Sequence, residues 1–110
     1  MINFYKKTIQ DKALRQISQL EVGCWINVFD PTEEEINYLI QELALDDNNI
    51  ESALDESELP RVDFIGENIY VFTKFIPDFT KSEVETHLIV ITTNFILTLS
   101  KSRPPFINEI

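Results

Sequence analysis

The sequence predicts an α/β domain in which helices cover a mixed, largely antiparallel β-sheet. Two observations support this fold class. A short strand-like segment at residues 25–28 leads into a strongly capped helix. The second half of the chain then consists of apolar segments separated by short turns, a pattern typical of strands. Residues 1–110 are enough for a single domain.

The clearest helix signal begins at residue 30, with the sequence Asp-Pro-Thr-Glu-Glu-Glu. Thr32 can accept a hydrogen bond from the backbone of Glu35, and Glu35 can return one to Thr32, which together form a capping box. Four apolar residues then follow at helical spacing and predict one buried stripe: Ile36, Leu39, Ile40 and Leu43. A second short helix is expected from Asp46 or Asp47.

Strands are expected at residues 2–4, 25–28, 61–65, 69–76, 84–92 and 95–99. The last three are joined by short connections and predict an antiparallel meander. Residues 14–22 are apolar in part but fit neither the helical nor the strand period. We expect five large side chains in the core: Trp25, Phe72, Ile89, Ile91 and Leu97.

Two of the strands, residues 87–91 and 95–99, are nearly continuous apolar runs. Such runs are typical of strands buried on both faces of a sheet. Two helices can hardly cover both faces, so we expect further helices beyond Ile110 to belong to the same fold. No segment approaches the ~20 apolar residues of a membrane-spanning helix, and we expect the chain itself to be soluble.

The formal net charge of −10 excludes whole classes of partner. Nucleic-acid binding needs a basic patch, and anionic membrane surfaces repel a strongly acidic domain. Cations are the expected partners, whether metal ions or basic protein surfaces. Cys24 is the only cysteine, so no internal disulfide is possible, which fits a reducing compartment.

The residues needed for catalysis are missing from the sequence. Gly23 and Gly66 are the only glycines and lie too far apart to form a phosphate-binding loop. His87 is the only histidine and lies within an expected strand, where a structural role is far more common than a catalytic one. We therefore expect a protein that is not an enzyme.

Carboxylates are the remaining functional groups, and they suit hard cations such as Mg²⁺, which retains several of its waters. The metal-site candidates are Asp78, in the connection after the long strand, with Glu83 and Glu85 as helpers. Further acidic candidates lie nearby in the sequence: Asp63, Glu67, Asp55, Glu56 and Glu58. The alternative for each is a solvated charge on a loop or helix end.

Several segments in the same order resemble the CorA family of magnesium and other divalent-cation transporters. Residues 25–28 leading into 30–35 are similar to the family's Trp-Ile-Asp followed by Pro-Thr-Glu-Glu-Glu. Residues 45–63 resemble its Leu-Glu-Asp-x-Leu passage into a strand, and residues 70–72 and 88–99 resemble the strands that follow. The resemblance covers nearly the whole chain.

The resemblance implies an N-terminal cytosolic domain with α/β/α layers, truncated before a stalk helix and two membrane helices. It also implies a homopentamer at the cytoplasmic face of the cell membrane, in which Mg²⁺ bound by acidic residues between subunits favours the closed channel. By position, Asp78 approximates an acidic residue that the family uses. The family's Gly-Met-Asn pore motif is absent from residues 1–110.

Two alternatives remain open at the level of sequence. The chain could be a free-standing acidic interaction module that shares the fold, or the domain of a relative that transports Zn²⁺ or Co²⁺. Two hydrophobic spans downstream of Ile110, joined near Gly-Met-Asn, would support transport.

Overall fold

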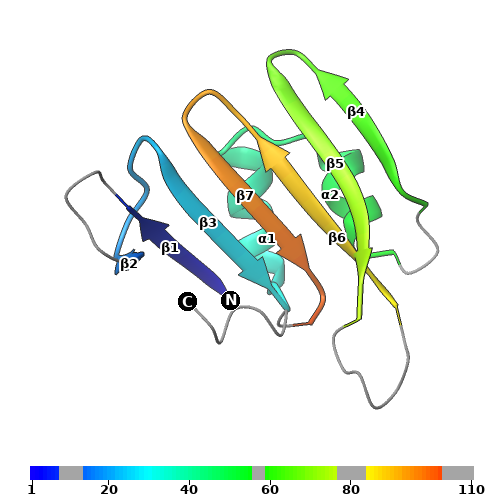
Figure 1. The fold of residues 1–110 in the computed structure, drawn as a ribbon, viewed down its shortest axis with the longest axis horizontal. Coiled ribbons are helices and arrows are strands. Elements are labelled where there is room, and N and C mark those ends of the chain that lie inside the picture. Colours follow the sequence, from blue (N-terminus) through cyan, green and yellow to red (C-terminus); the bar gives the residue numbers. More distant parts are fainter. Residues whose placement is uncertain (8–13, 56–58, 77–83, 103–110) are drawn as a thin grey trace.

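The computed structural model describes residues 1–7, 14–55, 59–76 and 84–102, which form a seven-stranded sheet and two helices (Figure 1). The strands in chain order are β1 (Ile2–Lys6), β2 (Arg15–Ile17), β3 (Cys24–Phe29), β4 (Arg61–Ile65), β5 (Asn68–Phe75), β6 (Glu85–Ile91) and β7 (Phe95–Ser100). The helices α1 (Glu33–Gln41) and α2 (Asp47–Ala53) lie between β3 and β4 in the sequence.

The strand order across the sheet is β2-β1-β3-β7-β6-β5-β4. Strands β4 to β7 form one antiparallel meander, which confirms the predicted meander and extends it by β4. Strand β3 pairs with β7 in parallel, while β1 and β2 add an antiparallel hairpin beyond β3. The predicted mixed, largely antiparallel sheet is therefore confirmed, with its parallel pair at the centre.

The predicted capping box starts α1. The backbone amide of Glu35 donates to Thr32 Oγ1 at 3.2 Å, and the amide of Thr32 donates to Glu35 Oε1 at 2.9 Å. Asp46 caps α2 by accepting a hydrogen bond from the amide of Asn49 at 3.0 Å. Such caps provide acceptors for backbone amides that have no partner within the first helical turn. Each cap typically contributes about 1 kcal/mol to the stability of the folded protein.

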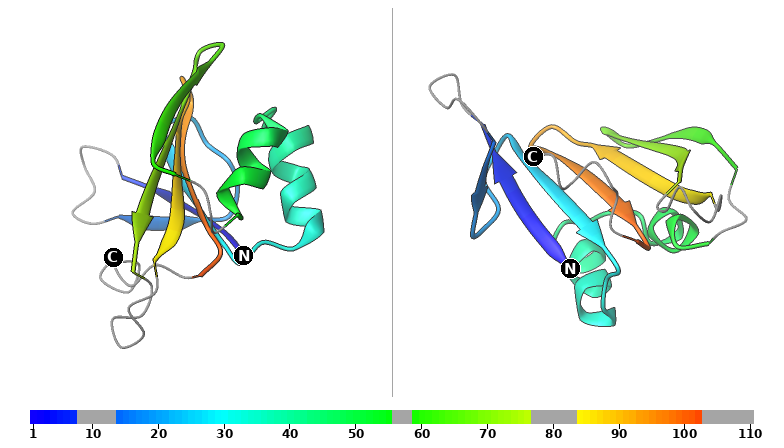
Figure 2. Two further views of the ribbon diagram at one scale, coloured as in Figure 1. Left: turned by 90° about the vertical axis from the view of Figure 1, so that its right-hand side faces the viewer. Right: turned by 60° about the horizontal axis from the view of Figure 1, so that its bottom comes forward.

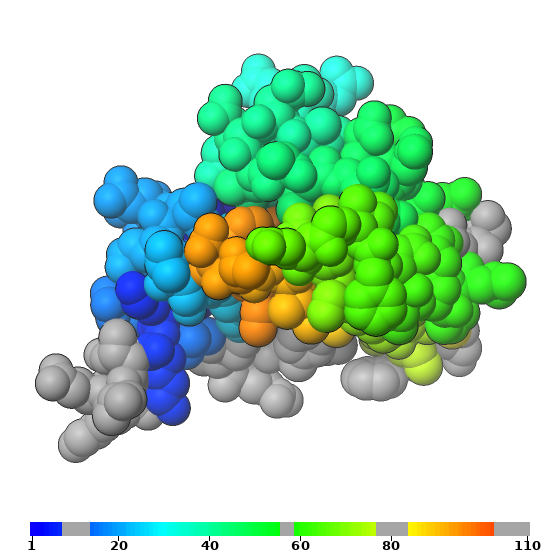
Figure 3. Space-filling model, turned by 90° about the horizontal axis from the view of Figure 1, so that it is seen from above, coloured from blue at the N-terminus to red at the C-terminus, as the bar shows by residue number. Residues whose placement is uncertain are grey.

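Both helices pack against the same face of the sheet (Figure 2) and form one layer on it (Figure 3). The helices bury Leu39 and Ile50 fully against the alternate residues of the central strands. The sheet residues of this core include Ile26, Val28, Leu88, Val90, Leu97 and Leu99. Among the described residues, no helix is long and apolar enough to cross a membrane.

The expected core is correct for two of its five members. Phe72 and Leu97 are buried on the helical face. Trp25 and Ile89 are only half-buried, and the prediction for Ile91 was wrong because its side chain is 38 % exposed. The reason is the strand period: these three side chains point to the opposite face from Phe72 and Leu97, where the described residues supply no helix.

Candidate functional site

The sheet face opposite the helices carries a broad apolar surface formed by the described residues. Two rows of neighbouring side chains cross it, and we call these rows together the open face. The first row, from β1 to β4, contains Tyr5, Trp25, Ile96, Ile91, Ile69 and Phe64. The second row, in the same strand order, contains Asn3, Asn27, Thr98, Ile89, Val71 and Val62.

Neither row of the open face contains a charged side chain, although charged residues make up a quarter of the chain (25 %). Several acidic residues lie instead on the helical layer, for example Glu33 and Glu34 on α1 and Asp47 on α2, while Glu85 at the start of β6 shares the side of the sheet with the open face. Phe64 is 74 % exposed and Ile96 is 46 % exposed. Exposed apolar patches are typical of surfaces that contact a protein, a membrane or an apolar ligand.

A short polar network lies in the middle of the open face, where β3 pairs with β7. Trp25 Nε1 donates to Thr98 Oγ1 at 2.9 Å, and Thr98 Oγ1 donates to Asn27 Oδ1 at 2.9 Å. Asn27 is 1 % exposed, and its Nδ2 atom has no hydrogen-bond partner among the described residues. The network fixes the register of the parallel pair and holds the indole ring 5.1 Å from the ring of Tyr5.

The open face continues into a shallow groove at the end of the sheet where β3 begins. The groove has a volume of about 320 Å³ and is lined by Val22, Trp25, Ile91, Asn94 and Ile96, among others. The backbone amide of Gly23 donates to the carbonyl of Asn94 at 2.5 Å, which joins the segment before β3 to the β6–β7 turn. The groove extends the apolar surface beyond the strands.

His87 lies on the same side of the sheet, nearer the other end. Its ring meets that of Phe75 edge-on, with the centroids 5.5 Å apart. Burial lowers the pKa of His87 from its ordinary value of 6.5, because the charged imidazolium loses hydration there. The lowered pKa favours the neutral form of the imidazole at this position.

The predicted metal ligands fall around the connection between β5 and β6. Asp78 and Glu83 lie outside the described residues. Glu85 is the first residue of β6, is half-buried, and pairs across the strands with Phe75. Glu85 is thus the one member of the predicted set whose position is described.

The described acidic candidates Asp55, Asp63 and Glu67 do not form a group of three or more with Glu85. Asp63 pairs with Arg61 at 3.0 Å on β4, and Glu67 lies in the turn at the far end of β5. The carbonyl of Asp55 accepts a hydrogen bond from Thr86 Oγ1 at 3.2 Å, whereas Glu56 and Glu58 lie outside the described residues. Within residues 1–7, 14–55, 59–76 and 84–102, no group of three or more potential metal-ligating side chains occurs.

Sequence comparison decides the family. Residues 21–110 match the family described as "CorA-like Mg2+ transporter protein". The chain belongs to this family. The cobalt/magnesium transport protein CorA of Methanocaldococcus jannaschii is 31 % identical over 80 residues, a match that covers 72 % of this chain and 25 % of that protein. The chain therefore spans about a quarter of the length of this curated CorA relative.

Solved structures agree on the fold. The soluble domain of CorA from M. jannaschii superimposes with a TM-score of 0.76 and 22 % identity, covering 99 % of this chain and 44 % of that domain. The complete CorA structure from the same organism gives the same TM-score of 0.76 and is covered to 35 %. The full-length CmaX protein gives a TM-score of 0.70 at 12 % identity, with 98 % of this chain and 36 % of that chain covered. At these identities the structures establish a shared CorA soluble-domain fold.

The open face was only partly visible in the sequence. The nearly continuous apolar runs of β6 and β7 predicted strands buried on both faces, but among the described residues only one face is covered, and Ile91 and Ile96 on the open face are 38 % and 46 % exposed. The hydrogen-bonded set of Trp25, Asn27 and Thr98 was not predicted. Its one signal is that Asn27 and Thr98 are polar residues within strands that are otherwise largely apolar.

Proposed function

We propose that this chain is the N-terminal cytosolic domain of a CorA-type divalent-cation transporter and takes part in Mg²⁺ sensing and gating. The single observation that supports this most is the match of residues 21–110 to the CorA-like Mg2+ transporter family. The open face, which has no charge and has large exposed apolar side chains, supports a cover supplied from outside the described residues. A surface of this composition is costly to leave in water, since each Å² of exposed apolar area costs roughly 25 cal/mol.

We also propose that a segment outside residues 1–110 packs against the open face. In the soluble domain of the M. jannaschii relative, the matched part is 44 % of the length, so more than half of that domain lies outside the match. We propose that helices following Ile110 pack on the open face and complete an α/β/α arrangement. Membrane helices would follow these, and identical chains would assemble as a homopentamer at the cytoplasmic face of the membrane.

The regulatory metal is proposed to bind at the β5–β6 connection, through Asp78, Glu83 and Glu85. A half-buried carboxylate at the end of a strand, as at Glu85, suits one direct or water-mediated contact to hydrated Mg²⁺. One chain would supply only one side of such a site, and a neighbouring subunit would supply the rest. Mg²⁺ would then bind the isolated chain weakly, because the ion gives up its waters reluctantly.

The experiment that tests this role is limited proteolysis of the complete transporter across a Mg²⁺ titration. We expect Mg²⁺ to protect the wild-type protein, and we expect Asp78→Asn to move the midpoint of protection to higher Mg²⁺. Glu85→Gln should shift it in the same direction. Glu51→Gln is the matched control, because Glu51 is an exposed acid on α2. Unchanged protection in both Asp78→Asn and Glu85→Gln would remove these residues from the sensing site.

Two alternatives make different predictions for the same protein. A free-standing interaction module would use the open face for a separate protein, and the gene would contain no membrane spans after Ile110. A relative that moves Zn²⁺ or Co²⁺ would show the same domain architecture, but that metal would protect it from proteolysis at lower concentration than Mg²⁺.

A further inference from the structure

The two edges of the sheet differ in how they meet solvent. At one edge, β2 has only three residues, and two of them, Arg15 and Gln16, are exposed polar residues. At the other edge, β4 is the outermost strand (Figure 1) and pairs only with β5 among the described residues. Proteins protect edge strands by making them short, charged or bulged, because unpaired backbone groups recruit other strands. Strand β2 has this protection.

Strand β4 carries exposed apolar side chains instead. Phe64 is 74 % exposed and Val62 is 52 % exposed, which makes them the most exposed large apolar side chains within the seven strands. Ile65, at the end of the strand, is 42 % exposed. The edge of the sheet at β4 is therefore apolar where the edge at β2 is polar.

The turn after β4 shows which of its backbone groups point outward. Gly66 has a φ of 60° and lies in the two-residue turn that joins Ile65 to Asn68. The residues that flank such a turn share its hydrogen bond, and bonded and non-bonded pairs alternate along an antiparallel ladder. Val62 and Phe64 are therefore in non-bonded pairs with β5, and their amides and carbonyls point away from it. A row of this kind matches the backbone of another extended strand.

The charges of β4 match a second copy of the same strand in one antiparallel register. Arg61 and Asp63 lie on the helical face, where Arg61 Nε donates to Asp63 Oδ2 at 3.0 Å. In two copies paired about a two-fold axis at Val62, each Arg61 lies opposite Asp63 of the other copy. A register shifted by two residues would place Asp63 opposite Asp63, where like charges repel. A shift by one residue would bring side chains from opposite faces together.

We propose that the outer edge of β4 is a self-association site, at which a second copy of this chain adds its own β4 in antiparallel orientation. The two Val62 residues exchange both of their backbone hydrogen bonds across the axis. The amide of each Phe64 donates to the carbonyl of Pro60 in the other copy, a position that needs no amide from the proline. The two sheets thereby become one continuous sheet.

This two-fold contact is separate from the fivefold assembly and the metal site of the proposed function. A contact restricted to one short strand is smaller than the roughly 1,000 Å² that specific association usually requires. We therefore expect weak association that increases with protein concentration.

Disulfide trapping tests the proposed register. Val62→Cys and Phe64→Cys variants of the 110-residue chain are equilibrated in a glutathione redox buffer. In the proposed register the two thiols of Val62→Cys face each other, with a Cα separation of about 5.5 Å, which suits a disulfide. Those of Phe64→Cys are four residues out of alignment, about 13 Å along the strand. The wild type measures any contribution of the native Cys24, which is 2 % exposed.

We expect about tenfold more cross-linked dimer from Val62→Cys than from Phe64→Cys at millimolar protein concentration. Random collision predicts the opposite order, because position 64 is more exposed than position 62. A parallel pairing would align both positions and give equal yields. Equal or greater cross-linking of Phe64→Cys, or no cross-linking of Val62→Cys above the wild type, would overturn the proposal.

Removing one charge tests the recognition between copies. Asp63→Asn added to Val62→Cys should lower the yield of dimer by about two- to tenfold at low salt, since exposed charge pairs contribute modestly. Glu67→Gln is the matched control, because Glu67 is an exposed acid in the turn after β4 and its loss should leave the yield unchanged. Equal effects of the two substitutions would contradict the paired charges.

Nuclear magnetic resonance of the wild type gives a measurement that needs no substitution. The amide resonances of Val62 and Phe64 should shift as the protein concentration rises from micromolar to millimolar, while that of Gln16 on the opposite edge stays constant. Concentration-independent resonances at both positions of β4 would overturn the proposed self-association.

Discussion

Replacing Thr98 by valine tests the polar network of the open face. The Thr98 hydroxyl is both the acceptor for Trp25 Nε1 and the donor to Asn27 Oδ1, each at 2.9 Å. Valine has almost the same shape but cannot make either bond. The substitution therefore removes the chemistry of the network with little change in packing.

The expected loss of stability in Thr98→Val follows from how deeply Asn27 and Trp25, the two hydrogen-bond partners of Thr98, are buried. Asn27 is 1 % exposed, so its Oδ1 atom would be left without a partner in a dry site, at about 1–3 kcal/mol. The indole of Trp25 is half-buried and can reach water, so its lost bond adds about 1 kcal/mol or less. Thr98→Val should lower the free energy of unfolding by about 2–3 kcal/mol, which corresponds to about 10–20 °C in Tm for a domain of this size.

Urea unfolding followed by the fluorescence of Trp25, the only tryptophan, measures this directly. The control is Thr93→Val, in the exposed β6–β7 turn, which should stay within about 0.5 kcal/mol of the wild type. Adding Asn27→Leu to Thr98→Val should recover most of the loss, because replacing both partners by apolar groups is nearly neutral. A loss below about 0.5 kcal/mol in Thr98→Val would refute the reasoning.

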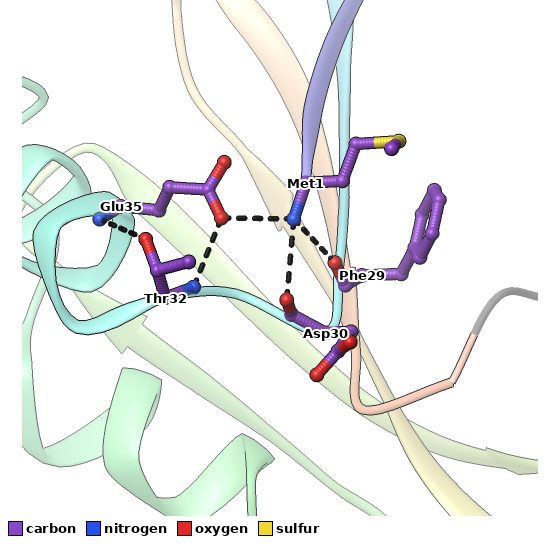
Figure 4. A network of polar contacts seen from close by, with 5 residues as sticks. All are labelled: Met1, Phe29, Asp30, Thr32 and Glu35. Carbon is purple, nitrogen blue, oxygen red and sulfur yellow. Dashed lines mark hydrogen bonds and ion pairs between the residues drawn. The ribbon is translucent and has the colours of Figure 1, made fainter.

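Three further outcomes are expected of the 110-residue chain. Phe72→Ala should cost about 3–5 kcal/mol in urea unfolding, because the ring is 2 % exposed and Arg61 lies over it at 4.0 Å; a cost below 1 kcal/mol would contradict its core position. Burial raises the pKa of Glu35 in the folded state, but the hydrogen bonds from the Met1 nitrogen and from Thr32 lower it by more (Figure 4). Because the net shift of this pKa is downward, the stabilisation by Glu35 is present above its ordinary value of 4.5 and is lost as the pH falls through the folded value. The difference in free energy of unfolding between the wild type and Glu35→Gln should therefore shrink between about pH 6 and pH 3. A difference that grows as the pH falls would contradict this prediction. Light scattering at micromolar concentration should show no stable pentamer, because specific association usually buries at least about 1,000 Å² and we attribute much of the assembly contact to segments outside this chain.

Local signals in the sequence were sufficient for most of the elements. The capping box of Thr32 and Glu35 placed the start of α1 correctly, because both halves of a cap lie within four residues. The strands of the meander were visible from their apolar runs and the short turns between them. These features depend on neighbours in the chain, which the sequence shows directly.

The features that were missed depend on partners far apart in the chain. Strand β2 has three residues and is stabilised by pairing with β1, so its own sequence has too little pattern to be recognised. The parallel pairing of β3 with β7 joins residues about seventy positions apart, and the Trp25–Thr98 bond follows from it. Ile91 was expected in the core because its segment is apolar on both faces, but the face it occupies has no cover among the described residues.

The candidate metal site was less predictable than the fold. A hydrated Mg²⁺ needs only a few carboxylates and imposes little spacing on the sequence. Glu85 is placed at the end of β6, and the roles of Asp78 and Glu83 remain predictions. In a site shared between identical subunits, the ligands come from positions with no fixed spacing along the chain, so no local sequence pattern marks them.

The accessibility of Ile96 tests the central claim most directly. Ile96 lies in the first row of the open face and is 46 % exposed, whereas the native Cys24 is buried at 2 %. An Ile96→Cys variant is labelled with a maleimide in the 110-residue chain and in the complete transporter, with Thr93→Cys in the exposed turn as the control. We predict rapid labelling of Ile96→Cys in the isolated chain and strong protection in the complete protein, while Thr93→Cys reacts in both. Equally rapid labelling of Ile96→Cys in the complete protein would contradict a covered open face.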